Sequence, residues 1–150
     1  MTDIVGGRNP ALTRVRRLAR DRALRRREGV YLVEGPTLVV DALSAGREVE
    51  QVFVPAEAAS SAVAAASETS GVPCRLVDDA LFDGLTTTMS AQPAIAVVAR
   101  HDVSVPDLPA DGVVVVLAEV ADPGNAGTLV RSAEAFGASG VVFAGGVDPY

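Results

Sequence analysis

The feature that most constrains the fold is an alternation of short apolar runs with helical segments along the chain. Apolar runs of strand length lie at residues 29–35, 49–55, 72–78, 93–100, 113–120 and 139–146. Segments of helical composition or spacing separate them, at residues 36–46, 56–71, 79–85 and 126–137. This alternation predicts an α/β fold whose sheets are largely parallel and covered by helices on both faces.

Residues 101–112 interrupt the alternation. They are rich in proline and aspartate and show no apolar periodicity, which is typical of a linker. We therefore expect one domain within residues 1–100 and a second unit at residues 113–150. The second unit has fewer than 40 residues. That length gives too small a core for an independent domain, so we expect it to be incomplete.

Charge is distributed unevenly along the chain. The 150 residues carry a formal net charge of −6, from 13 basic and 19 acidic residues. Residues 1–30 hold nine of the basic residues against three acidic ones, a net charge of +6. All basic residues are arginines, because the sequence contains no lysine. A basic segment on an acidic body indicates a localised anionic partner.

Most of these arginines lie in residues 10–28, which we interpret as one helix. Leu12, Val15, Ala19 and Ala23 fall on one stripe at helical spacing, and arginines occupy most of the remaining surface. Such a helix can contact RNA phosphates, or it can be an ordinary solvated surface helix. The candidates for RNA contact are Arg16, Arg17, Arg20, Arg25, Arg26 and Arg27.

Other kinds of site find little support in the sequence. Cys74, the single cysteine, cannot form an internal disulfide, and with the single histidine, His101, it cannot form a metal cluster. We expect Cys74 to be buried in a strand and His101 to be solvated. No apolar run approaches the roughly 20 residues of a membrane span, and no apolar signal segment opens the chain. We expect a cytoplasmic protein that binds neither metal nor membrane.

The strongest candidate site follows the apolar run at 113–120. The sequence Asp-Pro-Gly that starts at Asp122 suits a turn. Asn125 is a suitable N-cap for a helix over 126–137, and its side chain could equally point into the cleft beyond the carboxyl end of the strand. At 100° per residue, one side of this helix faces the sheet and Arg131 lies roughly opposite. The predicted sheet-facing residues are Ala126, Leu129, Val130, Ala133, Phe136 and Gly137.

Arg131 allows two interpretations. A helix N-terminus and an arginine near the carboxyl ends of parallel strands can bind phosphate or stabilise a developing oxyanion. Gly127 lies one turn before Arg131 on the same side and leaves the approach to the guanidinium open. Alternatively, Arg131 is a solvated residue paired with Glu134 three positions later.

Residues 120–150, VADPGNAGTLVRSAEAFGASGVVFAGGVDPY, closely resemble the first signature motif of the SpoU family of RNA 2′-O-ribose methyltransferases, in the knotted SPOUT superfamily. The pattern Asn-x-Gly-x-x-x-Arg-x-Ala-x-x-Phe-Gly, from Asn125 to Gly137, carries the resemblance. Residues 25–46, RRREGVYLVEGPTLVVDALSAG, resemble that family's RNA substrate-binding domain, a ribosomal-protein-like α/β module. The likeness extends over nearly the whole chain.

The resemblance implies a layout and a reaction. Residues 1–100 would form the RNA substrate-binding domain, 101–112 the linker, and 113–150 the start of a SPOUT trefoil-knot domain that is truncated before the knot. The family transfers a methyl group from S-adenosylmethionine to an RNA ribose 2′-hydroxyl. The implied RNA is 23S rRNA, and the full-length protein would be a homodimer. Arg131 matches the catalytic arginine of the motif, and Asn125 matches the asparagine that positions the nucleotide or the loop.

The family's cofactor motifs would follow residue 150. We therefore expect no cofactor-binding residue within this chain, and no activity from residues 1–150 alone. One alternative is a non-catalytic RNA-binding module derived from such an enzyme. A weaker one is a nucleotide-binding protein that uses the turn at Gly145-Gly146 for phosphate. It is weaker because the expected helix does not follow that turn.

Overall fold

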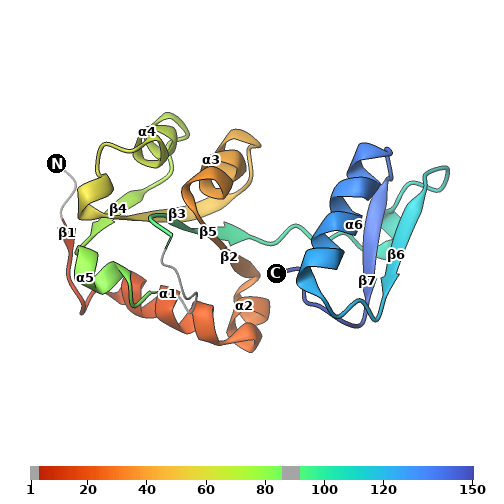
Figure 1. Ribbon diagram of the computed structural model, residues 1–150, viewed down its shortest axis with the longest axis horizontal. Coiled ribbons are helices and arrows are strands. Elements are labelled where there is room, and N and C mark those ends of the chain that lie inside the picture. Colours follow the sequence, from red (N-terminus) through yellow and green to blue (C-terminus); the bar gives the residue numbers. More distant parts are fainter. Residues whose placement is uncertain (1–3, 86–91) are drawn as a thin grey trace. The chain divides into compact units, whose positions relative to one another are not determined.

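The computed structural model describes residues 4–85 and 92–150, which form two compact units, Met1–Arg100 (unit 1) and His101–Tyr150 (unit 2) (Figure 1). The strands of unit 1 are β1 (Ile4–Val5), β2 (Val30–Glu34), β3 (Val49–Pro55), β4 (Cys74–Val77) and β5 (Ile95–Ala99). Its helices are α1 (Pro10–Arg20), α2 (Arg22–Glu28), α3 (Pro36–Ser44), η1 (Ala56–Ala58), α4 (Ala62–Thr69) and α5 (Asp79–Phe82). Unit 2 contains η2 (Val105–Asp107), β6 (Val114–Ala118), α6 (Pro123–Ala135) and β7 (Gly140–Ala144).

The sheet of unit 1 has the order β1-β4-β3-β5-β2. β1, β4 and β3 pair in parallel, as the alternating sequence predicts. β5 departs from this, because it is antiparallel to both β3 and β2. A parallel crossover usually carries a full helix, whereas α5, before β5, has only four residues.

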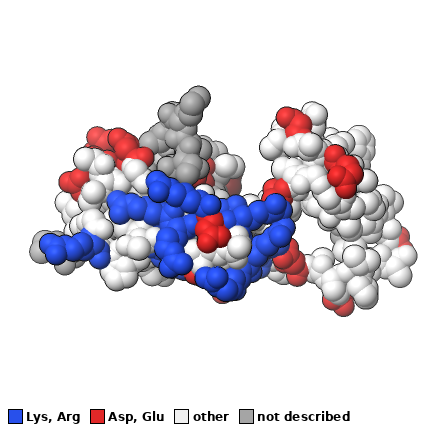
Figure 2. All heavy atoms as spheres, turned by 90° about the horizontal axis from the view of Figure 1, so that it is seen from below, with Lys and Arg blue, Asp and Glu red and all other residues white. Residues whose placement is uncertain are grey.

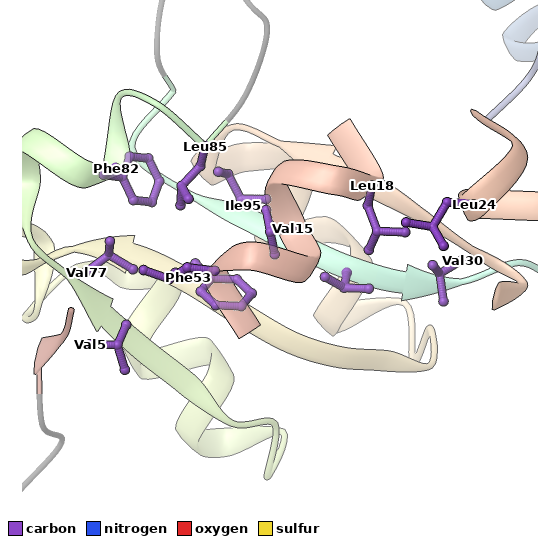
Figure 3. Packing of buried hydrophobic residues seen from close by; sticks show 12 residues of the cluster. Val5, Val15, Leu18, Leu24, Val30, Phe53, Val77, Phe82, Leu85 and Ile95 are labelled. Atoms are coloured by element: carbon purple, nitrogen blue, oxygen red, sulfur yellow. The ribbon is translucent and has the colours of Figure 1, made fainter. Parts of the chain in front are cut away.

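Helices cover both faces of this sheet, as predicted. α1, α2 and α5 pack against one face, where Val15, Leu18 and Leu24 point toward Phe53 and the neighbouring strands (Figure 3). α3 and α4 cover the other face and contribute Val39, Leu43 and Val63 to a second core. Successive residues of β3 belong to different cores, because side chains alternate between the faces of a strand.

The predicted single helix over 10–28 is wrong, because Asp21 divides it into α1 and α2. Asp21 has an extended backbone, and its N–H donates to the carbonyl of Arg17 at 2.9 Å. Its Oδ1 accepts from the N–H of Leu24 at 2.9 Å, so the same residue ends α1 and caps α2. The break changes the phase of the apolar stripe. Leu18 and Leu24 are buried, whereas Ala19 is half-buried and Ala23 is exposed.

The predicted helix over 56–71 is also interrupted. Its first residues form the short η1, and α4 begins only after Ser61, whose Oγ accepts from the N–H of Ala64 at 3.4 Å. Cys74 in β4 is half-buried, and not fully buried as predicted, because its strand lies next to the very short β1 at the edge of the sheet. His101 is exposed, as predicted.

Unit 2 is a βαβ unit in which β6 and β7 pair in parallel from Val114 with Gly140 to Ala118 with Ala144. The prediction that helices cover both faces of the sheet is wrong for β6, since Val116 is 59% exposed and Leu117 alone is buried in this strand. Within the described residues of this unit, α6 covers one face of the two-stranded sheet. The opposite face of β6 therefore stays accessible.

Candidate functional site

The arginines of α1 and α2 gather on one face of unit 1, where Figure 2 shows a broad basic surface with acidic side chains among it. Both helices bury their leucines and valines in the core beneath, so the arginines are left on the outer side. Of the six predicted contact residues, Arg17, Arg20, Arg26 and Arg27 are exposed, and Arg16 and Arg25 are half-buried. The structure thus brings the predicted RNA-contact residues onto one surface.

Arg25 and Arg14 of this region hold intramolecular partners that bear on its charge and its structure. Arg25 Nη1 donates to the carbonyl oxygen of Leu18 at 2.7 Å, across the junction of α1 and α2. Arg14 forms ion pairs with Glu28 and Glu50, each at 2.7 Å. The hydrogen bond that Arg14 donates to Glu50, and then the one that it donates to Glu28, raise the pKa of Arg14 against the opposing effect of burial. Arg14 is therefore charged, and its charge is compensated by these two carboxylates.

A hollow of about 300 Å³ opens among the arginines of α1. Arg16, Arg17 and Arg20 line it together with Thr13 and Asp21. Three guanidinium groups and one hydroxyl are all donors to anionic oxygens. The hollow therefore suits a phosphate of an RNA backbone.

In unit 2, the helix after β6 begins earlier than predicted. α6 starts at Pro123, and Asp122 is its N-cap, with Oδ1 accepting from the N–H of Asn125 at 2.7 Å. The prediction that Asn125 is the cap is therefore wrong. Proline is well suited to the first helical position, because it lacks the N–H that would need a partner there. Asn125 lies in the first turn with an exposed side chain.

The buried face of α6 is narrower than predicted. Ala126 and Ala133 are buried and Val130 is half-buried, whereas Leu129 is 41% and Phe136 is 93% exposed. A sheet of two strands covers only a narrow strip of the helix. Leu129 and Phe136 therefore project past its edge. Gly137, predicted to face the sheet as the last residue of the helix, instead lies after the end of α6 with φ of +74°.

Arg131 is exposed, and its guanidinium lies over the first turns of α6. Nη2 donates to Thr128 Oγ1 at 3.2 Å, and a Cβ on Gly127 would lie 3.2 Å from Nη1. The alternative pairing with Glu134 is not seen, because among the described residues no ion pair joins Arg131 to Glu134. The positively charged guanidinium thus has no carboxylate partner in the described chain.

A cavity of about 410 Å³ lies beside Arg131. Its lining includes Pro123 at the start of α6, Phe143 near the carboxyl end of β7, and residues 147–150 after β7. The cavity is therefore at the carboxyl ends of the parallel strands, where ligands of open α/β sheets bind. Asp148 and Tyr150 also line it, although no feature of the sequence pattern singles them out.

The glycine pair after β7 has a packing role. Gly145 and Gly146 have φ of +82° and +76°, and a Cβ on either would collide with Glu119 or with the backbone of Val120. Val147 N–H also donates to the carbonyl of Val120 at 2.8 Å. This close approach of two loops accounts for both glycines, and it weighs against their use as a phosphate-binding turn.

Other kinds of site are not seen in residues 4–85 and 92–150. No group of three or more His, Cys, Asp or Glu residues there could hold a metal ion. No helix within the described residues is long and apolar enough to cross a membrane.

Comparisons with known proteins identify the family. Residues 9–96 match the model of the MRM3-like substrate binding domain, which accounts for more than half of the chain. The chain is 30% identical over 122 residues to RlmP of Bacillus subtilis, a 23S rRNA guanosine 2′-O-methyltransferase. The matched region covers 81% of this chain and 46% of that protein. The chain belongs to the SpoU family of RNA methyltransferases. This SpoU-family chain is also 31% identical to a mitochondrial rRNA methyltransferase 3A of Danio rerio, over 90% of its own length and 32% of the relative's.

Solved structures show the same fold. An rRNA methyltransferase of Sinorhizobium meliloti with AdoMet bound has a TM-score of 0.77 and 26% identity, covering 98% of this chain and 56% of that one. The SpoU methyltransferase AviRb of Streptomyces viridochromogenes, in complex with AdoMet, has a TM-score of 0.72 and 26% identity. The match to AviRb covers 95% of this chain and 56% of AviRb. The SpoU-family chain thus spans about a third to a little over half of the lengths of these relatives.

Proposed function

We propose that this chain belongs to an RNA 2′-O-methyltransferase that uses S-adenosylmethionine. In this proposal the α1–α2 face of unit 1 binds ribosomal RNA, most simply 23S rRNA, and unit 2 contributes Arg131 and Asn125 to the reaction centre. The observation that carries the proposal is the position of Arg131, exposed beside a cavity at the carboxyl ends of β6 and β7 and without a carboxylate partner. The complete protein is proposed to be a homodimer.

Unit 1 supplies the RNA affinity in this account. The basic face concentrates guanidinium groups on a protein whose net charge is otherwise negative, so it attracts an RNA backbone to one surface only. The likeness of residues 9–96 to a substrate-binding domain supports the same role. Arg16, Arg17, Arg20, Arg26 and Arg27 are the proposed phosphate contacts, whereas Arg25 has a second, structural role through Leu18.

Arg131 acts in this proposal as an electrostatic group and not as a base, because a guanidinium stays protonated at any working pH. Its planar fork of N–H donors would hold the phosphate next to the target ribose. It would also stabilise negative charge on the 2′-oxygen as the hydroxyl passes its proton to a phosphate oxygen or to another side chain. Asn125, six residues earlier on α6, would position the nucleotide or the loop before it.

The lining of the cavity beside Arg131 does not fit S-adenosylmethionine. Seven of the ten residues that line the cavity beside Arg131 are apolar or glycine, and the polar ones are Arg131, Asp148 and Tyr150. The adenine, ribose, amino and carboxylate groups of the cofactor need more hydrogen-bond partners than these. We therefore place the cofactor site outside the described residues and propose that residues 1–150 alone neither bind the cofactor nor complete the reaction.

The proposed reaction can be tested by the chemistry of its product. The complete methyltransferase would be incubated with ribosomal RNA and S-adenosylmethionine labelled in the methyl group, and the RNA would then be hydrolysed in alkali. A 2′-O-methyl group removes the nucleophile for strand cleavage, so the label is expected in an alkali-stable dinucleotide. Label in mononucleotides would indicate methylation of a base and would reject the proposal.

A further inference from the structure

We infer that Thr128 is a positioning residue that holds the guanidinium of Arg131 in place, an inference that rests on the proposed function of Arg131. The two residues are three positions apart on α6, so their side chains lie on the same face of the helix. Arg131 Nη2 donates to Thr128 Oγ1 at 3.2 Å. Thr128 lies at one of the positions that the Asn-x-Gly-x-x-x-Arg pattern leaves unspecified.

The hydroxyl of Thr128 is itself oriented by the backbone. Thr128 Oγ1 donates to the carbonyl oxygen of Gly124 at 2.9 Å, one helical turn earlier. A hydroxyl has one hydrogen, so the side facing Arg131 presents only acceptor lone pairs. The branched threonine side chain also has few rotamers in a helix. Thr128 therefore offers Arg131 a fixed acceptor that is connected to the first turn of α6.

Gly127 completes this arrangement. A Cβ at Gly127 would lie 3.2 Å from Arg131 Nη1, which is closer than an ordinary van der Waals contact. The absence of a side chain lets the guanidinium lie across the helix, with its Nη2 end at Thr128. A guanidinium has five N–H groups, and this contact uses one of them. The others are available to a phosphate, since no carboxylate of the described chain pairs with Arg131.

The consequence is a division of roles between affinity and turnover. An exposed arginine otherwise samples many rotamers, and this freedom is lost when it binds a phosphate in one geometry. Thr128 limits that freedom before RNA arrives. Because the arginines of unit 1 supply most of the proposed RNA affinity, loss of the Thr128 hydroxyl is expected to change turnover more than RNA binding.

The test compares Thr128→Val and Thr128→Ala, which lack the hydroxyl, with Thr128→Ser, which keeps it. Thr69→Val is the matched control, because Thr69 is also exposed and donates to a carbonyl four residues earlier, that of Ala65 at 3.0 Å, but has no arginine partner. The first readout is the order of the Arg131 Nε–H group, from nitrogen-15 relaxation on the 150-residue chain. The second is kcat and KM for RNA in the complete methyltransferase.

Thr128→Val and Thr128→Ala are expected to lower the order of the Arg131 side chain and to reduce kcat by about threefold to tenfold, the usual worth of one such hydrogen bond. KM for RNA should stay within about twofold. Thr128→Ser should restore both readouts, and Thr69→Val should change neither. Amide spectra of α6 check that the helix is intact.

The outcomes separate the inference from the proposed function. Unchanged Arg131 order and unchanged kcat in Thr128→Val and Thr128→Ala, with Arg131→Ala inactive, would overturn the role of Thr128 alone. Near wild-type turnover in Arg131→Ala would overturn the proposed function of Arg131, and with it the positioning role of Thr128. Loss of kcat in Thr128→Ser equal to that in Thr128→Val would also contradict the inference, because the hydroxyl would then not be the cause.

Discussion

Arg25 Nη1 donates a hydrogen bond of 2.7 Å to the backbone carbonyl of Leu18, so one arginine of the basic face also joins α1 to α2. Its neighbour Arg26 is exposed on the same helix and has no such bond. The two residues have the same charge and adjacent positions. They therefore allow the structural and the RNA-binding roles of this face to be measured separately.

Arg25→Ala is expected to lower the free energy of unfolding by about 1 kcal/mol, because a carbonyl at the helix junction loses its donor. Arg26→Ala should change it by less than about 0.5 kcal/mol, as is usual for exposed positions. Urea denaturation followed by circular dichroism measures both. Equal stability of the two variants would contradict a structural role for Arg25.

RNA binding by unit 1 should depend steeply on salt, because phosphate contacts release counterions. The combined replacement of Arg16, Arg17 and Arg20 by alanine should reduce the slope of log Kd against log salt by about 2, at about 0.7 for each single-strand phosphate contact. Fluorescence anisotropy with a labelled RNA oligonucleotide, from 50 to 300 mM salt, measures the slope, with Arg47→Ala as a control outside α1 and α2. An unchanged slope would exclude the hollow on α1 as the contact.

Glu50→Gln should tighten RNA binding by about twofold to threefold at low salt, because it removes one negative charge from the basic face and frees one end of Arg14. The pKa of Arg14 is already raised, chiefly by the bond to Glu50, so Arg14 stays charged at working pH with or without this partner. Glu57→Gln is the control, since Glu57 is exposed and lies in η1, away from α1 and α2 in the sequence. Similar gains in both variants would indicate a general charge effect and not release of Arg14.

The N-terminus of α6 should depend on Asp122 and not on Asn125. Asp122→Ala is expected to destabilise the helix by about 1 kcal/mol, because the N–H of Asn125 loses its acceptor. Asn125→Ala should cost less than about 0.5 kcal/mol. Hydrogen exchange of the α6 amides measures both effects. Faster exchange in Asn125→Ala than in Asp122→Ala would mean that Asn125 caps the helix after all.

Much of the α/β pattern could be predicted from the sequence, because the alternation of apolar runs reports burial directly. The prediction failed where a single polar side chain decides a boundary. Asp21 and Ser61 each cap a helix inside a segment that the apolar spacing presents as continuous. The apolar periodicity is read over a long window and therefore does not detect a short break in a helix. The break becomes visible only from the hydrogen bond of the capping side chain.

The direction of β5 and the exposure of α6 could not be predicted from the sequence pattern, for a different reason. A strand has the same composition whether its neighbours run parallel or antiparallel, so β5 could not be distinguished. Leu129 and Phe136 have the spacing of a buried stripe, but burial depends on how wide the opposing sheet is. Two strands are too few to cover both residues.

For the candidate site, the sequence singled out Arg131 and Gly127, and the structure places them together. It did not indicate Thr128, because a threonine in a helix gives no sign of which neighbour its hydroxyl contacts. Asp148 and Tyr150 reach the same cavity only through the turn after β7, which brings back a segment that is distant in sequence from Arg131. The catalytic roles of Arg131 and Asn125 stay predictions.

The most direct test of the account is the turnover of an Arg131→Lys variant of the complete methyltransferase, with RNA affinity measured in parallel. Lysine keeps the positive charge but lacks the planar fork that holds a phosphate by two bonds. We expect kcat to fall by about 100-fold or more, as on removal of a donor to a developing oxyanion, while Kd for RNA stays within about threefold. Turnover close to that of the wild type would show that the guanidinium is not part of the reaction centre, and would contradict the account.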